Sequence, residues 1–121
     1  MAIQSVKDIQ AFNKSFQFAM FIFHASASFP KEEKYSLTDQ IRQSSRSVSV
    51  NIAEGWAKRT YPKQFKRHLI DSYGSIEETK VWLEFAYQCE YLAADRYSDL
   101  SNTANLISSM VYNLHSNWKT F

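Results

Sequence analysis

The chain has 121 residues, of which 45% are hydrophobic and 16% aromatic, and this fits one globular domain over residues 1–121. Two glycines and two prolines are too few turn residues for an all-β protein and favour long helices. A net charge of +2 is well below the strongly basic balance of dedicated nucleic-acid-binding proteins.

The N-terminal segment predicts neither a signal peptide nor a membrane span, because Lys7, Asp8 and Lys14 interrupt its first apolar run. Cys89 is the single cysteine, so the chain cannot form an internal disulfide. We therefore expect a cytoplasmic protein that makes no membrane contact.

The first predicted helix follows a capping-box pattern at Ser5 and Asp8 and ends at Phe29-Pro30. The residues whose spacing of three and four predicts its buried stripe are Ile9, Phe12, Phe16, Ala19, Phe23 and Ala27. A second apolar stripe on a neighbouring face comprises Phe18, Ile22, Ala25 and Phe29. The apolar arc is wider than a monomer needs, and the extra surface of Phe18, Phe21 and Ile22 indicates contact with another subunit.

The second helix is predicted from about Leu37 to Lys58, with its N-cap signal at Ser36 and Asp39. Its predicted buried stripe comprises Leu37, Ile41, Ser44 or Ser45, Val48 and Ile52. Serines are poor helix formers in isolation, so their density indicates a segment where small side chains let helix backbones approach closely.

The third helix is predicted to begin with Thr60 as N-cap and Pro62 in its first turn, and to end between Cys89 and Leu92. Its apolar positions are Phe65, Leu69, Tyr73 with Ser72, Ile76, Leu83 and Ala86. The fourth helix starts near Asp95 and carries a heptad seam of Tyr97, Leu100, Ala104, Ile107, Val111, Leu114 and Trp118. Four amphipathic helices with short connections predict an all-α, up-down-up-down four-helix bundle.

No motif in the sequence predicts catalysis or metal binding. His24, His68 and His115 are isolated, and aromatic residues precede them where a di-metal bundle would have glutamates. The sequence also contains no glycine-rich phosphate loop, no paired-cysteine zinc spacing and no H-E-x-x-H helix. We therefore expect a protein without enzymatic activity, metal or cofactor.

Asn51 and Glu54 lie three residues apart and share one face of the second predicted helix. They are interpreted either as a buried polar network that fixes the register of the helices or as a binding or catalytic pair. We favour the structural network, because buried polar groups need hydrogen-bond partners.

The main candidate site is a basic cluster at the junction of the second and third helices. Its members are Lys58, Arg59, Lys63, Lys66 and Arg67, and Arg42 and Arg46 extend it along the second helix. Cations beside a helix N-terminus are suited to bind phosphates. A solvated surface, or a contact between oppositely charged parts of an oligomer, would give the same pattern, since seven acids follow between Asp71 and Asp99.

Several runs of sequence are characteristic of one family, and these are FPKEE at 29–33, LTDQIR at 37–42, SVSVNIAEG at 47–55, GSIEE at 74–78, Phe65 and Tyr91-Leu92. Through them the chain resembles the four helix bundle proteins, also called 23S rRNA-intervening-sequence or S23 ribosomal proteins. The resemblance covers nearly the whole domain. One departure is Gln43, which stands where members commonly carry a second arginine and which predicts weaker polyanion binding.

The resemblance extends to accessory proteins of diversity-generating retroelements, which form ring-shaped homopentamers and bind nucleic acid and a reverse transcriptase. It implies a ring-forming homopentamer whose partners are RNA or a protein such as a reverse transcriptase, and it carries over no catalytic residues. Two functions follow from the sequence. One is a non-catalytic oligomer that binds nucleic acid phosphates through the seven basic residues, and the other is an oligomeric protein–protein interaction scaffold.

Overall fold

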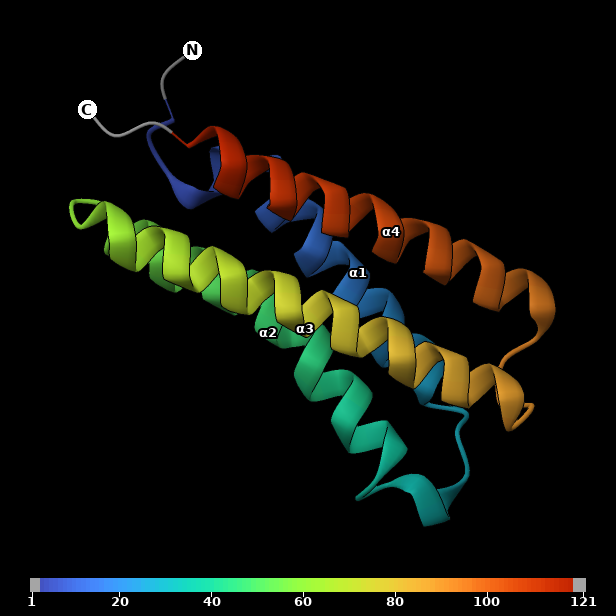
Figure 1. Ribbon diagram of the computed structural model, residues 1–121. Helices are drawn as coiled ribbons and strands as arrows, with labels where there is room; N and C mark the ends of the chain where they lie inside the picture. The colour runs from blue at the N-terminus through green and yellow to red at the C-terminus, as the bar shows by residue number, and fades with distance from the viewer. Residues whose placement is uncertain (1–2, 119–121) are drawn as a thin grey trace.

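The computed structural model describes residues 3–118, and over these residues the chain is helical and contains no strand (Figure 1). The elements are η1 (Val6–Asp8), α1 (Gln10–Ser26), η2 (Lys31–Glu33), α2 (Leu37–Ala57), α3 (Pro62–Gln88) and α4 (Ala94–Asn117). Successive α-helices run in opposite directions, as short connections require (Figure 1). The all-helical, four-helix prediction is confirmed. In this part of the chain no helix has the length and apolar composition needed to cross a bilayer.

The predicted apolar stripes of α2, α3 and α4 form the core. Ile41, Val48 and Ile52 of α2 are fully buried. The fully buried apolar residues of α3 and α4 are Phe65, Leu69, Ile76, Leu83, Ala86, Ala104, Ile107 and Val111. Tyr73 departs from its predicted core position, because the small Ser72 occupies that position and Tyr73 is 37% exposed.

The predicted stripe of α1 was wrong in part. The side chains of α1 that are buried are Ala11, Ser15, Phe18, Ala19, Ile22 and Ser26. Phe18 and Ile22, which were expected to contact another subunit, therefore lie in the core, and Phe16 and Phe23 lie outside it. The large apolar residues of α1 that are exposed are Phe16, Met20, Phe21 and Phe23, which we call the α1 aromatic ridge. The apolar arc of α1 is wider than the core uses, but of the three residues expected to be surplus only Phe21 is exposed.

Two helix-start predictions have different outcomes. Ser5 and Asp8 form the predicted capping box, although it starts the short η1 rather than α1. Thr60 is not the N-cap of α3, because Tyr61 holds that position and Pro62 is the first helical residue. Proline without its N–H costs little there, so the start of α3 is fixed by Pro62 and not by a capping side chain.

The start of α2 is capped from outside the helix. Ser36 occupies the predicted N-cap position, but its side chain does not bond the helix backbone. The Glu33 carboxylate instead accepts hydrogen bonds from the Ser36 hydroxyl at 2.5 Å and from the Leu37 N–H at 3.4 Å. A carboxylate at a helix N-terminus is favoured by the unsatisfied N–H groups and by the helix dipole.

The contact between α2 and α3, which we call the α2–α3 seam, is built from small polar side chains. The Ser72 hydroxyl donates to the Val48 carbonyl at 2.8 Å, and the Thr79 hydroxyl donates to the Ser44 hydroxyl at 2.8 Å. These four residues are all buried, so the hydroxyls are satisfied across the seam. The predicted role of the α2 serines in close packing is consistent with this geometry.

Gly55 marks the closest approach within the α2–α3 seam. A methyl group at this position would lie 2.8 Å from Cδ1 of Phe65 and 2.8 Å from Cβ of His68. Carbon atoms in contact are normally about 3.5 to 4.0 Å apart, so only glycine fits at this position without displacing α3. The spacing of α2 and α3 at this end therefore depends on the missing side chain.

Candidate nucleic-acid interface

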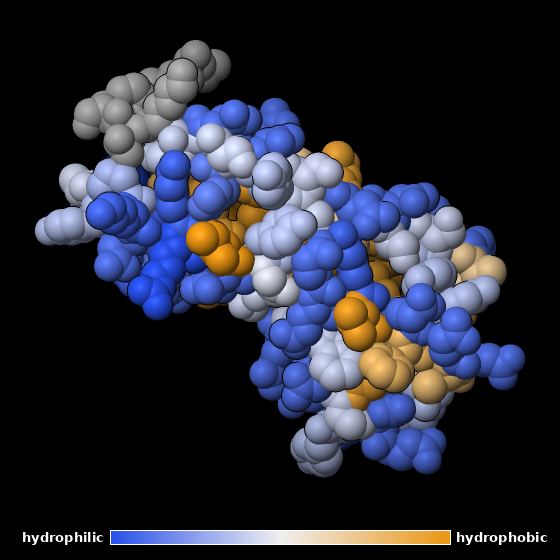
Figure 2. Space-filling view, viewed as in Figure 1, coloured by the Kyte–Doolittle hydropathy of each residue, from blue (hydrophilic) through white to orange (hydrophobic). Residues whose placement is uncertain are grey.

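Five of the predicted basic residues surround the connection between α2 and α3, and we call this surface the basic end. Its members are Lys58 at the C-cap of α2, Arg59 in the connection, and Lys63, Lys66 and Arg67 in the first turns of α3. Lys66 is partly exposed and the other four are exposed. Figure 2 shows hydrophilic side chains gathered over this end of the molecule.

Arg59 is held in place by an aromatic neighbour. Its guanidinium lies 4.0 Å from the ring centroid of Trp56 and donates to the Trp56 carbonyl at 3.0 Å. Trp56 is itself buried and packs edge-on against Phe65 and Trp118. Arginine stacked on a fixed aromatic ring loses less conformational freedom when it binds a further partner.

Lys58 joins a polar chain that crosses from α2 to α3. Its Nζ lies 3.1 Å from Nε2 of His68, and Nδ1 of His68 lies 3.2 Å from Oδ1 of Asn51. Because the Asn51 oxygen can only accept, Nδ1 is the donor in this pair and Nε2 accepts from the lysine. Asn51 also donates to the carbonyl and the hydroxyl of Ser47, at 3.0 Å each. His68 thus orients Lys58 toward the basic end.

The predicted polar network contains Asn51 but not Glu54. Asn51 bonds His68 and Ser47 at a partly buried position, as a register-fixing residue requires. Glu54 is exposed and makes no side-chain hydrogen bond within residues 3–118, so its predicted burial was wrong. Glu54 precedes Gly55 on the α2 helix, and its side chain points to solvent beside the seam instead of into it.

Arg42 and Arg46 lie apart from the basic end. Sixteen residues separate Arg42 from Lys58, which corresponds to about 24 Å along a helix. The Arg42 guanidinium donates to the Ser26 hydroxyl at 2.8 Å and to the Phe23 carbonyl at 3.2 Å, and it lies 4.6 Å from the Phe23 ring centroid. Arg46 lies 5.9 Å from the same ring. Arg42 therefore caps the C-terminus of α1, where a cation is favoured by the helix dipole.

The cations of the basic end form no ion pair within the described part of the chain. The only ion pair found there joins Lys80 and Glu77, which lie further along α3. The basic end therefore gathers five lysines and arginines without an ion pair at one end of a molecule whose net charge is only +2. Such a local concentration of cations attracts polyanions.

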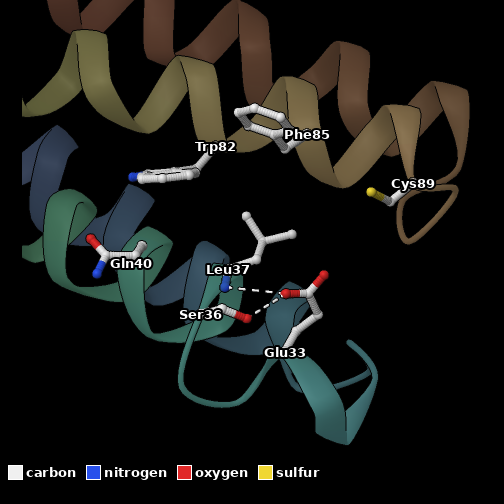
Figure 3. Close-up of a pocket in the computed structure, with 7 residues that line it drawn as sticks. All are labelled: Glu33, Ser36, Leu37, Gln40, Trp82, Phe85 and Cys89. Atoms are coloured by element: carbon white, nitrogen blue, oxygen red, sulfur yellow. Dashed lines mark hydrogen bonds between the residues drawn. The ribbon is translucent and has the colours of Figure 1, made fainter.

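A separate apolar pocket lies between the start of α2 and the end of α3 (Figure 3). It has a volume of about 480 Å³ and is lined by Glu33, Ser36, Leu37, Gln40, Trp82, Phe85 and Cys89. Leu37 points from α2 toward Trp82 and Phe85, and the Glu33 carboxylate is turned to the backbone of α2 (Figure 3). This pocket is suited to an apolar side chain.

No group of three or more metal-ligating side chains lies together in residues 3–118. The three histidines lie on α1, α3 and α4, and the one that makes polar contacts, His68, bonds Asn51 and Lys58. The arrangement offers charge and hydrogen bonds for binding.

Comparison with known proteins decides the family. Residues 7–113 match the family described as 23S rRNA-intervening sequence protein. The chain belongs to this family. It is also similar to a protein with unknown function from the S23 ribosomal protein family of Bacteroides thetaiotaomicron, with a TM-score of 0.82 and 25% identity. The alignment covers 92% of this chain and 99% of that chain. No curated protein matches the chain.

Membership of the 23S rRNA-intervening sequence protein family confirms the resemblance seen in the sequence, and the similar S23 protein shares the fold. Two residues of the candidate site were not foreseen in their roles. These are Trp56, on which Arg59 stacks, and His68, which bonds Lys58. For Trp56 the signal is its spacing, because Arg59 follows it by three residues. For His68 no sequence signal exists, because its partners lie ten and seventeen residues away.

Proposed function

We propose that this 23S rRNA-intervening sequence protein is a non-catalytic oligomer that binds RNA or other nucleic acid through its basic end. The observation that carries the proposal is the group of five cations around the N-terminus of α3, none of which forms an ion pair within residues 3–118. Phosphates are bound by lysine, arginine and the free N–H groups of a helix start. Contacts of this kind position a nucleic acid without reading its sequence.

The oligomer is part of this proposal. The α1 aromatic ridge exposes Phe16 at 55%, Met20 at 44%, Phe21 at 47% and Phe23 at 36%, and several large apolar residues exposed on one helix favour an interaction site. We take the ridge as the interface of a homopentameric ring, following the family resemblance. A ring would place several basic ends on one assembly, and several weak sites acting together bind a long polyanion tightly.

The assembly is tested by light scattering coupled to size exclusion at micromolar concentration. The wild type is expected to elute as an oligomer, and the Phe16→Ser, Phe21→Ser double variant as a folded monomer, because both changes remove exposed aromatics from the ridge. A matched control is Ile70→Ser, an exposed apolar residue on α3 that lies outside the ridge. A wild-type monomer would overturn the oligomer.

Nucleic-acid binding is tested with a labelled RNA hairpin at several salt concentrations. The Lys63→Glu, Lys66→Glu, Arg67→Glu variant is expected to bind at least about ten-fold more weakly and to show a shallower salt dependence, because each lost phosphate contact lowers the slope by roughly 0.7 to 0.9. The control reverses three exposed lysines elsewhere, Lys7, Lys31 and Lys34, for an equal change in net charge. An equal loss in both variants, or no binding at low salt, would contradict the proposal.

A second candidate function is a protein–protein interaction scaffold. The observation that favours it is the apolar pocket in Figure 3, beside which Phe85 is 53% exposed. A partner such as a reverse transcriptase would insert an apolar side chain over Leu37. This candidate predicts a partner that is recovered from nuclease-treated extract by the wild type and lost with Phe85→Ser, while the basic-end variant still recovers it.

A further inference from the structure

A groove between α3 and α4 lies on the side of α3 that faces away from the α2–α3 seam. Its volume is about 510 Å³. It is lined by Tyr73, Glu77 and Lys80 of α3 and by Asn105, Ser108, Ser109, Tyr112 and Asn113 of α4. The groove lining is aromatic and polar, unlike the apolar pocket at the start of α2.

Two tyrosines form an aromatic pair across the groove. The ring centroids of Tyr73 and Tyr112 lie 6.1 Å apart with an interplanar angle of 57°. The rings remain 37% and 59% exposed, so a large part of each ring is in contact with water. Partly exposed aromatic rings are platforms on which planar bases stack, and each stacked base contributes about 1 to 3 kcal/mol in single-strand-binding proteins.

Hydrogen-bonding groups surround the two rings. The side chains of Asn105, Ser109 and Asn113 make no hydrogen bond to protein within residues 3–118. Two amides and a hydroxyl supply both donors and acceptors, which is what the edge of a nucleobase requires. The groove therefore combines a stacking surface with unoccupied polar groups.

The one carboxylate in the groove is already compensated. Glu77 accepts hydrogen bonds from the ammonium of Lys80 and from the hydroxyl of Ser108. Burial opposes its ionisation, but the hydrogen bonds from Lys80 and Ser108 and the charge of Lys80 outweigh this and lower the pKa of Glu77. The Glu77 charge is thus balanced by Lys80 and does not repel a phosphate chain.

The groove is continuous with the basic end along α3. Lys66 lies seven residues before Tyr73, so the two residues share one face of the helix about 10 Å apart. A strand whose bases enter the groove can therefore place its next phosphates on Lys66 and the rest of the basic end. A neutral sugar could also stack on the two rings and bond the amides. The cations of the basic end next to the groove favour an anionic ligand instead.

We propose that the α3–α4 groove binds the bases of single-stranded nucleic acid, stacked on Tyr73 and Tyr112, while the strand's phosphates follow Lys66 to the basic end. The inference rests on the proposed function and adds the substrate class. In a duplex the bases are stacked on one another and hidden from such a groove, whereas an unpaired strand can splay them onto aromatic side chains.

The test compares three labelled probes of equal phosphate number by fluorescence anisotropy: an oligouridine, its abasic counterpart and a duplex. The wild-type protein is expected to bind oligouridine more tightly than the other two. Tyr73→Ala with Tyr112→Ala is expected to weaken oligouridine binding about ten-fold and to leave abasic binding unchanged, since only the stacking is removed. The Tyr73→Phe, Tyr112→Phe variant keeps the rings and is expected to retain binding.

The matched control is Tyr35→Ala, which removes a tyrosine that is 84% exposed and lies outside the groove. Equal affinity of the wild type for oligouridine and the abasic probe would overturn the base site and leave the basic-end proposal standing. Absence of all binding at low salt would overturn both. If the double alanine variant melts early in circular dichroism, Tyr112→Leu alone serves, and unchanged oligouridine affinity in that variant also overturns the base site.

Discussion

Helix α3 has two unlike sides. Toward α2 it contributes Ser72 and Thr79, whose buried hydroxyls bond the facing helix at 2.8 Å. Toward α4 it contributes Tyr73, which lines an open groove of about 510 Å³. Ser72 and Tyr73 are neighbours in the sequence, yet one is fully buried and the other is 37% exposed. The small Ser72 side chain therefore goes with a closed contact between helices, and the large Tyr73 side chain goes with an open groove.

The difference teaches how one helix serves both stability and binding. Hydroxyl and glycine positions let backbones approach and satisfy their own polar groups, so the α2–α3 seam is closed to ligands. Aromatic and amide side chains leave polar groups and ring faces in contact with water, so the α3–α4 groove remains open to ligands. Substitutions of similar size are therefore expected to have opposite consequences on the two sides.

The largest effect is expected on the closed side, from Gly55→Ala. The added methyl group would lie 2.8 Å from the fully buried Phe65 ring, which has no room to move. Overpacking of this kind lowers the free energy of unfolding by about 1 to 3 kcal/mol, and we expect the upper half of that range. Urea unfolding measures the change. Stability equal to that of the wild type would show that the seam is not closed at this end.

The next effect is expected from Ser72→Ala, also in the seam. The substitution removes the hydrogen bond to the Val48 carbonyl at a fully buried position, and it should cost about 1 kcal/mol of unfolding free energy. Ser109→Ala on the groove side is the matched control, with an expected change within about 0.5 kcal/mol. Equal costs for the two serines in urea unfolding would remove the distinction between the two sides.

Gly74→Ala should act in the opposite direction from Gly55→Ala. Gly74 lies in the interior of α3 and a methyl group there would meet no atom within 4 Å. Alanine is favoured over glycine in helices by about 0.8 to 1 kcal/mol, so this variant should be more stable than the wild type by roughly that amount. The same urea measurement applies, and a loss of stability would mean that the side of α3 at Gly74 is closed.

The helices themselves were largely predictable because most carry one apolar stripe. In α2 and α4 most of the periodic residues are buried. In α1 aromatic residues occupy several faces, and periodicity alone cannot choose between Phe16 and Phe18. Ser15 and Ser26 are the informative residues, because they are small, buried and on the same face as Phe18.

The basic end was predictable because its residues are nearly contiguous in the sequence and meet through one turn. The charge of Arg42 alone does not show that the length of α2 separates it from Lys58. Its partners Phe23 and Ser26 lie on another helix, so sequence spacing does not reveal them. The groove at Tyr73 and Tyr112 depends on which faces of α3 and α4 meet, and this is decided by packing of the whole core.

The smallest effect is expected where the closed side of α3 continues beyond the helix. Glu90 adopts a left-handed conformation with φ of 65°, and the Tyr91 N–H returns to the Ala86 carbonyl at 2.8 Å. This turn, a Schellman motif, directs the Tyr91 hydroxyl to the Glu33 carboxylate at 2.9 Å. The end of α3 is thereby tied to the segment that precedes α2.

The bond between Tyr91 and Glu33 should be visible in titrations. The hydrogen bond to Glu33, with desolvation and nearby negative charges, raises the pKa of Tyr91 from 10.0 to about 12. Hydrogen bonds from Ser36 and Tyr91 lower the pKa of Glu33 below 4.5. Because the folded state favours the neutral phenol, the stability that Tyr91 contributes is present below pH 10 and lost as the pH rises toward 12. The Glu33 contribution is present above pH 4.5 and lost as the pH falls through its lowered pKa.

Tyr91→Phe is therefore expected to remove the alkaline loss of stability due to this residue and to make the loss of stability on acidification smaller, since the Glu33 pKa returns toward 4.5 without the phenol. Thermal melting across pH, with tyrosinate absorbance, measures both. Tyr35→Phe is the control, because Tyr35 is 84% exposed and forms no hydrogen bond in residues 3–118. The wild type should show a tyrosine titration near pH 12 that is missing in Tyr91→Phe. If it does not, the bond to Glu33 is not formed in solution, and the closed side of α3 ends with the helix.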